Sequence, residues 1–151
     1  MSRKKCHRRP ITPLPPRGLR PGLDRAQLLD LGLAHVINLD LIATGKATTD
    51  ELWQALGGAL TWSRVAQLLG VGQVEMAEQM AVLEAVVARW QRTGRVGFSG
   101  TEYQRAKDGV ALMDELARIV DRPTAVAAAE WGEARVNRVA AQKRAEAAAA
   151  A

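Results

Sequence analysis

A chain of 151 residues in which 48% are hydrophobic is long enough to bury a sizeable core without disulfide bonds or a structural metal. Its single cysteine excludes an internal disulfide and favours a reducing cytoplasm, and the absence of an uninterrupted run of about 18 apolar residues argues against a membrane span. The net charge of +5 is unevenly divided, because residues 1–25 carry eight Lys and Arg against one Asp, whereas residues 26–135 carry ten against fourteen Asp and Glu. The sequence therefore predicts a soluble protein whose positive charge is concentrated near its N-terminus.

Residues 1–23 are predicted to form a basic arm that is disordered in the free protein. Five of the six prolines fall in this segment, and each proline fixes φ and removes a backbone donor, so neither a helix nor a central strand can form. Basic side chains crowd together near its start: Arg3, Lys4, Lys5, Arg8 and Arg9. We expect these residues to bind nucleic-acid phosphates without sequence specificity, or to bind an acidic partner protein, unless the segment is only a solvated tail.

Helices are predicted to follow the arm. The first, at residues 24–43, is apolar over much of its circumference, so we expect it to be covered on more than one side inside the assembly. Thr48 opens the second helix, because Glu51 three residues later completes a Thr-x-x-Glu capping box. Gly57 and Gly58 then predict a kink or a break, since each glycine costs about 1 kcal/mol relative to alanine inside a helix.

The third helix, at residues 73–93, provides a central apolar stripe. Its large side chains recur at intervals of four and three, which places them on one helical face: Met76, Met80, Leu83, Val87 and Trp90. After a connection at residues 95–100 with room for a short strand, Ser99 and Glu102 form a second capping box that opens a fourth helix to about residue 120. We expect the stripe to be buried against residues of that helix: Tyr103, Val110, Met113 and Ala117.

A fifth helix is predicted from about Thr124, with a weak apolar stripe of Val126, Trp131, Val136 and Val139. From residue 140 onward alanine dominates, so helix propensity is high but few side chains remain to dock the segment, and we expect it to fray. The sequence thus predicts an all-α bundle of about five helices. Its divisions are a Pro-rich basic arm at residues 1–23, a bundle domain at residues 24–139 and an Ala-rich tail at residues 140–151.

Residues that carry enzymatic chemistry are scarce in this chain. Cys6 and His7 supply only two of the four ligands that a zinc site requires. His35 lies in the apolar first helix, where we interpret it as a partly buried structural residue. No glycine-rich loop follows a strand, so no nucleotide-binding fingerprint is present. We therefore expect no enzymatic activity, no cofactor and no metal.

Residues 62–80 allow a different interpretation, as a DNA-reading helix-turn-helix. Ala66 and Gly70 match the small residue and the turn glycine of that motif. The corresponding recognition helix carries Glu75 and Glu78 near its start and no Lys or Arg there, whereas positive side chains normally help such helices to approach the phosphates. An ordinary corner between two bundle helices is the simpler interpretation.

Four short stretches resemble a protein family: Met1-Ser2-Arg3-Lys4-Lys5, Gly45-Lys46-Ala47-Thr48, Gly70-Val71-Gly72 and Thr93-Gly94-Arg95. Together they are similar to short proteins of proteobacterial prophages and related mobile elements that are sometimes labelled Fis-like transcriptional regulators. The similarity is diffuse and extends from residue 1 to about residue 135. It implies a phage-like origin and a DNA-binding helix-turn-helix near the C-terminus, whereas the candidate corner of this chain lies mid-chain.

Three functions remain open from the sequence. The first is a non-enzymatic accessory or regulatory protein of a phage-like element, located in the bacterial cytoplasm, that binds nucleic acid or an acidic partner through the arm. The second is a protein-interaction module or self-assembling homo-oligomer in which the arm is incidental. The third is a transcriptional regulator that uses residues 62–80. None of these functions involves a membrane.

Overall fold

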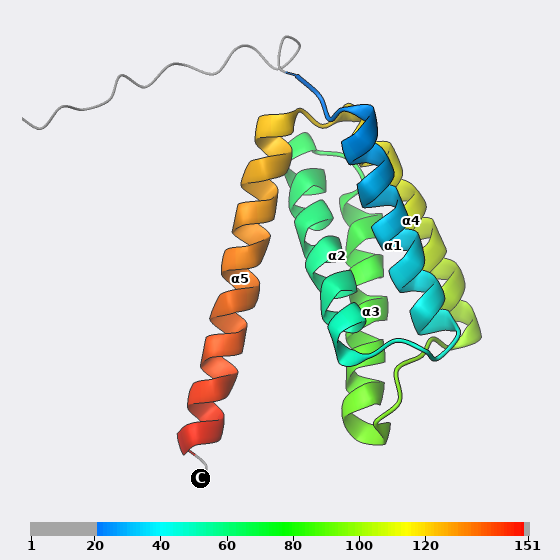
Figure 1. The fold of residues 1–151 in the computed structure, drawn as a ribbon, viewed down its shortest axis with the longest axis vertical. Helices are drawn as coiled ribbons and strands as arrows, with labels where there is room; N and C mark the ends of the chain where they lie inside the picture. Colours follow the sequence, from blue (N-terminus) through cyan, green and yellow to red (C-terminus); the bar gives the residue numbers. More distant parts are fainter. Residues whose placement is uncertain (1–20, 150–151) are drawn as a thin grey trace, which may run out of the picture.

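Helix α2 (Thr49–Leu69) lies at the centre of the fold and contacts each of the other four helices. The computed structural model describes residues 21–149, with the backbone alone at residues 140, 143, 144 and 147. Over this range the predicted all-α bundle of five helices is confirmed, and the chain reverses direction from each helix to the next (Figure 1). The remaining helices are α1 (Arg25–Ala43), α3 (Gln73–Thr93), α4 (Gly100–Ile119) and α5 (Arg122–Ala149).

Side chains at the helix ends hold the predicted boundaries. Thr48 and Glu51 form the expected capping box, in which the Glu51 carboxylate accepts a hydrogen bond from the Thr48 backbone N–H at 2.7 Å. Asp24 and Gln27 make the same reciprocal arrangement at the start of α1, with distances of 2.9 and 3.0 Å. α3 ends at Gly94, whose φ of 70° is a left-handed conformation that glycine adopts without steric cost. Local capping chemistry therefore sets these boundaries.

The expected break at Gly57 and Gly58 is wrong, because α2 runs without interruption from Thr49 to Leu69. The reason is a close approach between helices. A Cβ atom added at Gly58 would lie 2.8 Å from Cε1 of His35 in α1, so only glycine allows α1 to pack this closely on α2. The packing gained across the contact offsets the low helix propensity of the two glycines.

The connection between α3 and α4 contains no strand, contrary to the room that the sequence left for one. Within residues 21–149 the only β-type contact is an isolated bridge between Gly22 and Asp121. Val96 and Phe98 instead point their side chains into the core clusters. No extended neighbour lies alongside the connection to pair with its backbone, so side-chain packing determines its path.

The predicted packing of α3 against α4 is confirmed at its centre and corrected at its edges. The residues found buried as expected are Met76, Leu83, Val110, Met113 and Ala117. Three others are only partly buried, namely Met80, Val87 and Trp90, and Tyr103 is 38% exposed. α3 buries Gln79, Val82 and Val86 in addition. Because α3 contacts both α2 and α4, its buried arc is wider than one stripe and extends to the side that faces α4.

The expectation that α1 is covered on more than one side is wrong. α1 contacts α2 and α4, and it fully buries only Asn38 and Ile42. Both contacts lie on one side of the helix, so the apolar residues of the opposite side face outward. In α1 the apolar residues therefore form two faces, one packed on the bundle and one exposed.

The stripe predicted on α5 is also corrected, because Val126, Val136 and Val139 are exposed and only Trp131 is partly buried. α5 docks on α2 through small residues instead: Ala128 and Gly132 are buried, and a Cβ atom added at Gly132 would lie 2.7 Å from Oγ1 of Thr61. Figure 1 shows α5 beside α2 near its start and further from the bundle toward its end. The helix continues through the segment predicted to fray, as far as Ala149.

The two adjacent glycines of α2 provide a matched test of the close approach to α1. A Cβ atom added at Gly57 meets nothing within 4 Å, so Gly57→Ala is expected to raise the free energy of unfolding by about 0.5–1 kcal/mol through helix propensity. Gly58→Ala is expected to lower it by about 1–3 kcal/mol, because the new methyl group collides with His35. Urea denaturation measures both values. Equal stability of the two variants would show that the packing of α1 on α2 does not require glycine at position 58.

Candidate interaction surface

The predicted phosphate-binding residues Arg3, Lys4, Lys5, Arg8 and Arg9 lie outside the described residues, so their role stays a prediction. The described chain begins at the junction of α4 and α5. There the backbone N–H of Arg122 donates to the carbonyl of Pro21 at 2.8 Å, and Gly22 bridges Asp121. These contacts fix the point at which the basic segment joins the bundle.

The candidate helix-turn-helix corner forms part of the bundle packing. Gln73 and Glu75 are exposed at the start of α3, and Met76 one residue later is buried. A Cβ atom added at Gly72 would lie 2.9 Å from Cδ2 of Leu112, which shows that the turn packs directly on α4. The corner thus has the geometry of a bundle corner whose first helical turn presents a glutamate to solvent.

His35 has the structural role that the sequence suggested. The indole Nε1–H of Trp62 in α2 donates to Nε2 of His35 at 2.9 Å, and the two rings meet edge to face. Burial lowers the pKa of His35, and the carboxylate of Asp114 opposes this effect only in part. A neutral imidazole is required here, because a protonated Nε2 cannot accept the hydrogen bond from Trp62. His35 therefore stabilises the contact between α1 and α2.

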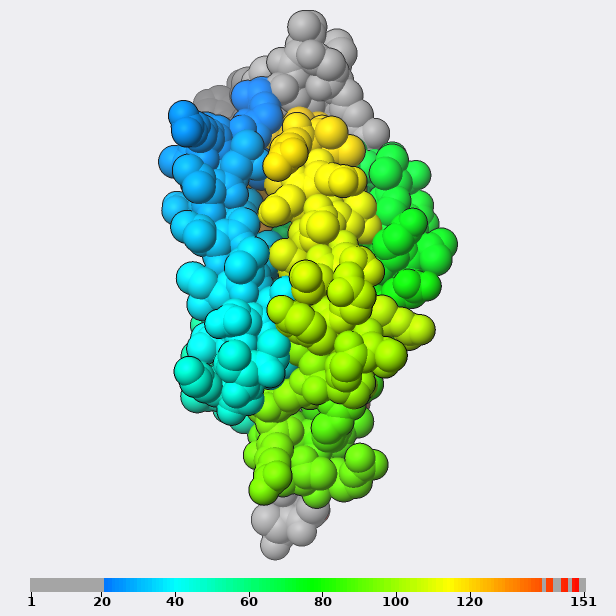
Figure 2. Space-filling model, turned by 90° about the vertical axis from the view of Figure 1, so that its right-hand side faces the viewer, coloured from blue at the N-terminus to red at the C-terminus, as the bar shows by residue number. Residues whose placement is uncertain are grey.

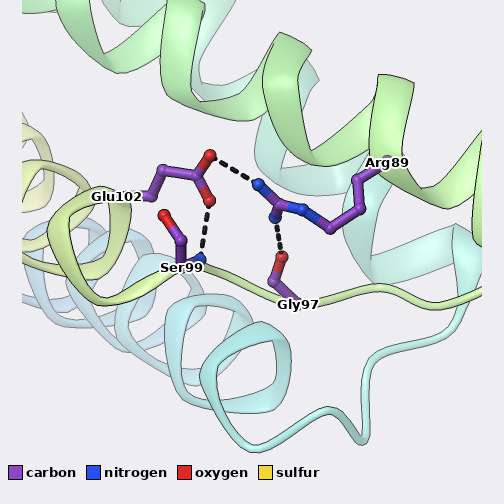
Figure 3. A network of polar contacts seen from close by, with 4 residues as sticks. All are labelled: Arg89, Gly97, Ser99 and Glu102. Atoms are coloured by element: carbon purple, nitrogen blue, oxygen red, sulfur yellow. Dashed lines mark hydrogen bonds and ion pairs between the residues drawn. The ribbon is translucent and has the colours of Figure 1, made fainter.

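Arg89, near the end of α3, holds the connection between α3 and α4 in place (Figure 3). Nη2 of Arg89 lies 2.6 Å from Oε1 of Glu102, and Nη1 donates to the carbonyl of Gly97. The second carboxylate oxygen of Glu102 accepts the backbone N–H of Ser99 at 2.7 Å. The hydrogen bond from Arg89 lowers the pKa of Glu102, so the pair is ionised at neutral pH. Arg89 is thus committed to fastening the connection between α3 and α4.

The outer side of α1 carries a continuous apolar surface, which we call the α1 outer face. Its aliphatic members are each 50–55% exposed: Leu29, Leu33, Val36 and Ile37. Their spacing places them on one side of the helix, opposite the buried Ile42. Covering the exposed half of such a side chain stabilises a complex by roughly 1 kcal/mol.

A groove extends the α1 outer face toward α4. Figure 2 shows α1 and α4 side by side on one face of the molecule. The groove between them has a volume of about 400 Å³, and Ala117 lies along it. Arg25 and Arg118 line the same groove, and Asp114 also borders it. The surface therefore combines an apolar centre with charged groups beside it.

α1 is also the one helix within residues 21–149 that is long and apolar enough, by length and composition, to cross a membrane. Asp30 and Asp40 interrupt the segment, so it is not an uninterrupted run of about 18 apolar residues, and the expectation that the chain does not span a membrane stays a prediction. Only 6% of this apolar stretch of α1 is buried in the fold. Because so little of this apolar helix is buried, the α1 outer face is exposed.

A second apolar groove of about 560 Å³ separates α5 from α2 and α3. Most of its lining residues are apolar: Trp53, Leu56, Leu60, Met80, Val136 and Val139. Two charged residues, Glu84 and Arg135, line it as well. It exists because the small residues Ala128 and Gly132 hold only the first part of α5 against α2.

Comparison of the chain with protein-family models, with curated proteins and with solved structures finds no match.

Sequence reasoning found the apolar character of α1 but missed that half of it faces outward. The available signal was the arrangement of apolar residues around the whole helix, which requires neighbours on every side. A bundle with four other helices could have supplied these neighbours.

The part of the chain that the structure describes holds no group of three or more His, Cys, Asp and Glu side chains suited to a metal ion.

The hydrogen bond between Trp62 and His35 predicts a pH dependence of stability. The folded-state pKa of His35 lies below its usual value near 6.5, so the unfolded chain takes up a proton first as the pH falls. The free energy of unfolding should therefore fall between about pH 7.5 and pH 5.5. Urea denaturation of His35→Gln, which keeps an acceptor for Trp62 but does not titrate, should show a smaller change over this range. Parallel pH profiles for the two proteins would exclude His35 as the cause.

Proposed function

We propose that this chain is a non-enzymatic interaction module that binds protein through the α1 outer face. The supporting observation is the half-exposed set of Leu29, Leu33, Val36 and Ile37 on one side of a helix whose other side is packed. Contiguous apolar surface of this kind on a folded domain is typical of binding sites. An apolar helical face with a neighbouring groove is suited to pairing with another helix.

The energetics favour a partner that covers more than the four aliphatic side chains. Their burial contributes roughly 4 kcal/mol in all, if each contributes about 1 kcal/mol. Association costs an estimated 4–15 kcal/mol in lost freedom, so these side chains alone give no stable complex. A partner must therefore also bury apolar surface of its own and engage the α1/α4 groove with its flanking charges. This requirement favours a specific partner.

The titratable groups with altered pKa values favour a non-enzymatic role. His35 accepts a hydrogen bond from Trp62, and Glu102 is paired with Arg89 and the backbone of Ser99. Burial lowers the pKa of His35 and the hydrogen bond from Arg89 lowers the pKa of Glu102, and each group fixes a contact between elements of the fold. Neither is held beside an open pocket together with a nucleophile, which is the arrangement that acid–base or covalent catalysis requires.

Site-specific photo-crosslinking tests the α1 outer face directly. With p-benzoyl-phenylalanine in place of Leu33, irradiation of cells should give a covalent adduct with another polypeptide, because this position is central to the face. Val74 of α3 is the matched control, since it is 70% exposed and lies on a different helix. Equal adduct formation at both positions, or none at Leu33, would contradict the proposed function.

A second function, binding of nucleic acid or an acidic partner by the basic arm, is favoured by the partition of charge. The eight basic residues within 1–25 contrast with the net negative charge of residues 26–135. Electrostatic attraction to phosphates is therefore concentrated in one segment, while the bundle opposes it weakly. This function is compatible with protein binding through α1.

Deletion of residues 1–10 should abolish binding to duplex DNA and leave the thermal midpoint nearly unchanged. With about five phosphate contacts, the logarithm of the affinity of the intact chain should fall against the logarithm of salt concentration with a slope near −4 to −5. Reversing the charges of Arg8 and Arg9 should weaken binding to all DNA sequences alike. A deleted chain with unchanged affinity would clear the arm of this role, and fluorescence anisotropy measures each case.

A further inference from the structure

We infer that the α1 outer face binds the same face of a second copy of this chain, with the two α1 helices antiparallel. The inference rests on the proposed role of this face in binding protein, and it names the partner. Three features of the described residues support it: the symmetry of the aliphatic positions, the placement of charge along α1 and the length of the helix. Each is considered in turn.

Three of the four aliphatic positions, Leu29, Leu33 and Val36, match each other when two copies of α1 pair about Leu33, whereas Ile37 on the other flank lies opposite Asp30 of the second copy. Leu29 lies four residues before Leu33, and Val36 lies three residues after it, on the same side of the helix. An antiparallel pair related by a twofold axis at Leu33 therefore places Leu29 of each copy against Val36 of the other. Leu33 then meets its own counterpart at the centre. Such self-complementarity is the requirement for a symmetric dimer interface.

Charges near the ends of α1 favour the antiparallel orientation. Arg25 is exposed at the N-terminal end, where Arg118 of α4 lines the same groove. Asp40 is exposed near the C-terminal end, two helical turns beyond Leu33 and so on the same face. Antiparallel pairing brings Arg25 of each copy beside Asp40 of the other, twice by symmetry. Parallel pairing would bring the two Asp40 carboxylates together, which is repulsive.

Two aspartates of α1 argue against a lipid surface as the partner of this face. Asp40 lies on the α1 outer face itself, and Asp30 is exposed at its edge. Inserting the face into a bilayer would remove Asp40 from water without a partner, and an anionic surface would repel both carboxylates. A second copy supplies Arg25 as the partner of Asp40. Charge complementarity therefore favours protein over lipid.

A stable dimer requires the α1/α4 groove as well as the aliphatic side chains of the α1 outer face. α1 has 19 residues and a length of about 28 Å. A standard specific interface buries about 800 Å² on each partner, more than a few aliphatic side chains provide. The α1/α4 groove adjoins the first two thirds of the face, and Arg118 and Asp114 of α4 line it. The resulting dimer is expected to be in equilibrium with monomer at micromolar concentrations.

Sedimentation equilibrium of the full chain from about 1 to 100 µM tests the inference. The wild-type chain should show a reversible monomer–dimer equilibrium. Leu33→Glu should weaken dimerisation at least about tenfold, because it places two carboxylates at the twofold axis. Val74→Glu is the control, since it introduces the same charge at an exposed valine away from α1, and it should leave the equilibrium unchanged. Circular dichroism establishes that both variants keep the fold.

Charge reversal tests the orientation. Arg25→Glu and Asp40→Arg should each weaken the dimer several-fold, and the chain with both changes should recover close to the wild-type affinity. Recovery requires that the two positions meet across the interface, which a structural effect within one chain does not produce.

Several results would overturn the inference. They are a wild-type chain that stays monomeric at the highest concentration, equal loss of dimer in Leu33→Glu and Val74→Glu, or no recovery in the charge-reversed double variant. A monomer that binds vesicles of phosphatidylcholine and phosphatidylglycerol through Leu33 would identify lipid as the occupant instead. An adduct at position 33 with a different protein, from a chain that is monomeric alone, would overturn this inference and leave the proposed function standing.

Discussion

The close approach of α1 to α2 at Gly58 is the contact on which the arrangement of this fold depends. No side chain fits between Gly58 and the ring of His35, and one turn further along α2 the indole of Trp62 donates a hydrogen bond to that ring. Together these contacts fix which side of α1 faces the bundle. Since α1 is apolar over much of its circumference, fixing one side inward leaves Leu29, Leu33, Val36 and Ile37 facing outward.

α2 uses the same device where it receives α5. Gly132 of α5 faces Thr61 so closely that a larger residue would not fit, and the neighbouring Ala128 is also buried. Docking through small residues requires little apolar area, so Val126, Val136 and Val139 of α5 remain exposed. Both outer helices of this bundle are therefore held by narrow contacts, and each leaves apolar surface available to a partner.

Much of the fold was predictable from the sequence because its signals are local. Capping boxes at Thr48 and Ser99 and the glycine at Gly94 act within one helical turn, and they place the helix boundaries to within a residue or two. The break at Gly57 and Gly58 failed as a prediction because the deciding atom, Cε1 of His35, lies more than twenty residues away in the chain. The exposure of Leu33 was missed for a related reason. Periodicity indicates that a face is apolar, but only the number and position of the other helices determine whether that face is covered.

The account joins two parts of the chain that differ in chemistry. The bundle is mildly acidic and carries an apolar face suited to protein, whereas the basic residues are concentrated before α1. In the antiparallel dimer the two chain segments that precede α1 would leave from opposite ends of the interface. Such a dimer would carry two basic arms, and under the proposed phosphate-binding role each arm would provide one point of attachment to an extended polyanion.

Disulfide trapping tests the α1 outer face most directly, because it reports on contact between two copies at one atom pair. In a chain carrying Cys6→Ser, oxidation of the Leu33→Cys variant should give a covalent dimer, since each new thiol would face its counterpart across the twofold axis. The Val74→Cys variant in the same background should remain monomeric. Equal yields of covalent dimer at the two positions would contradict the account, because they would indicate random collision and not a specific interface.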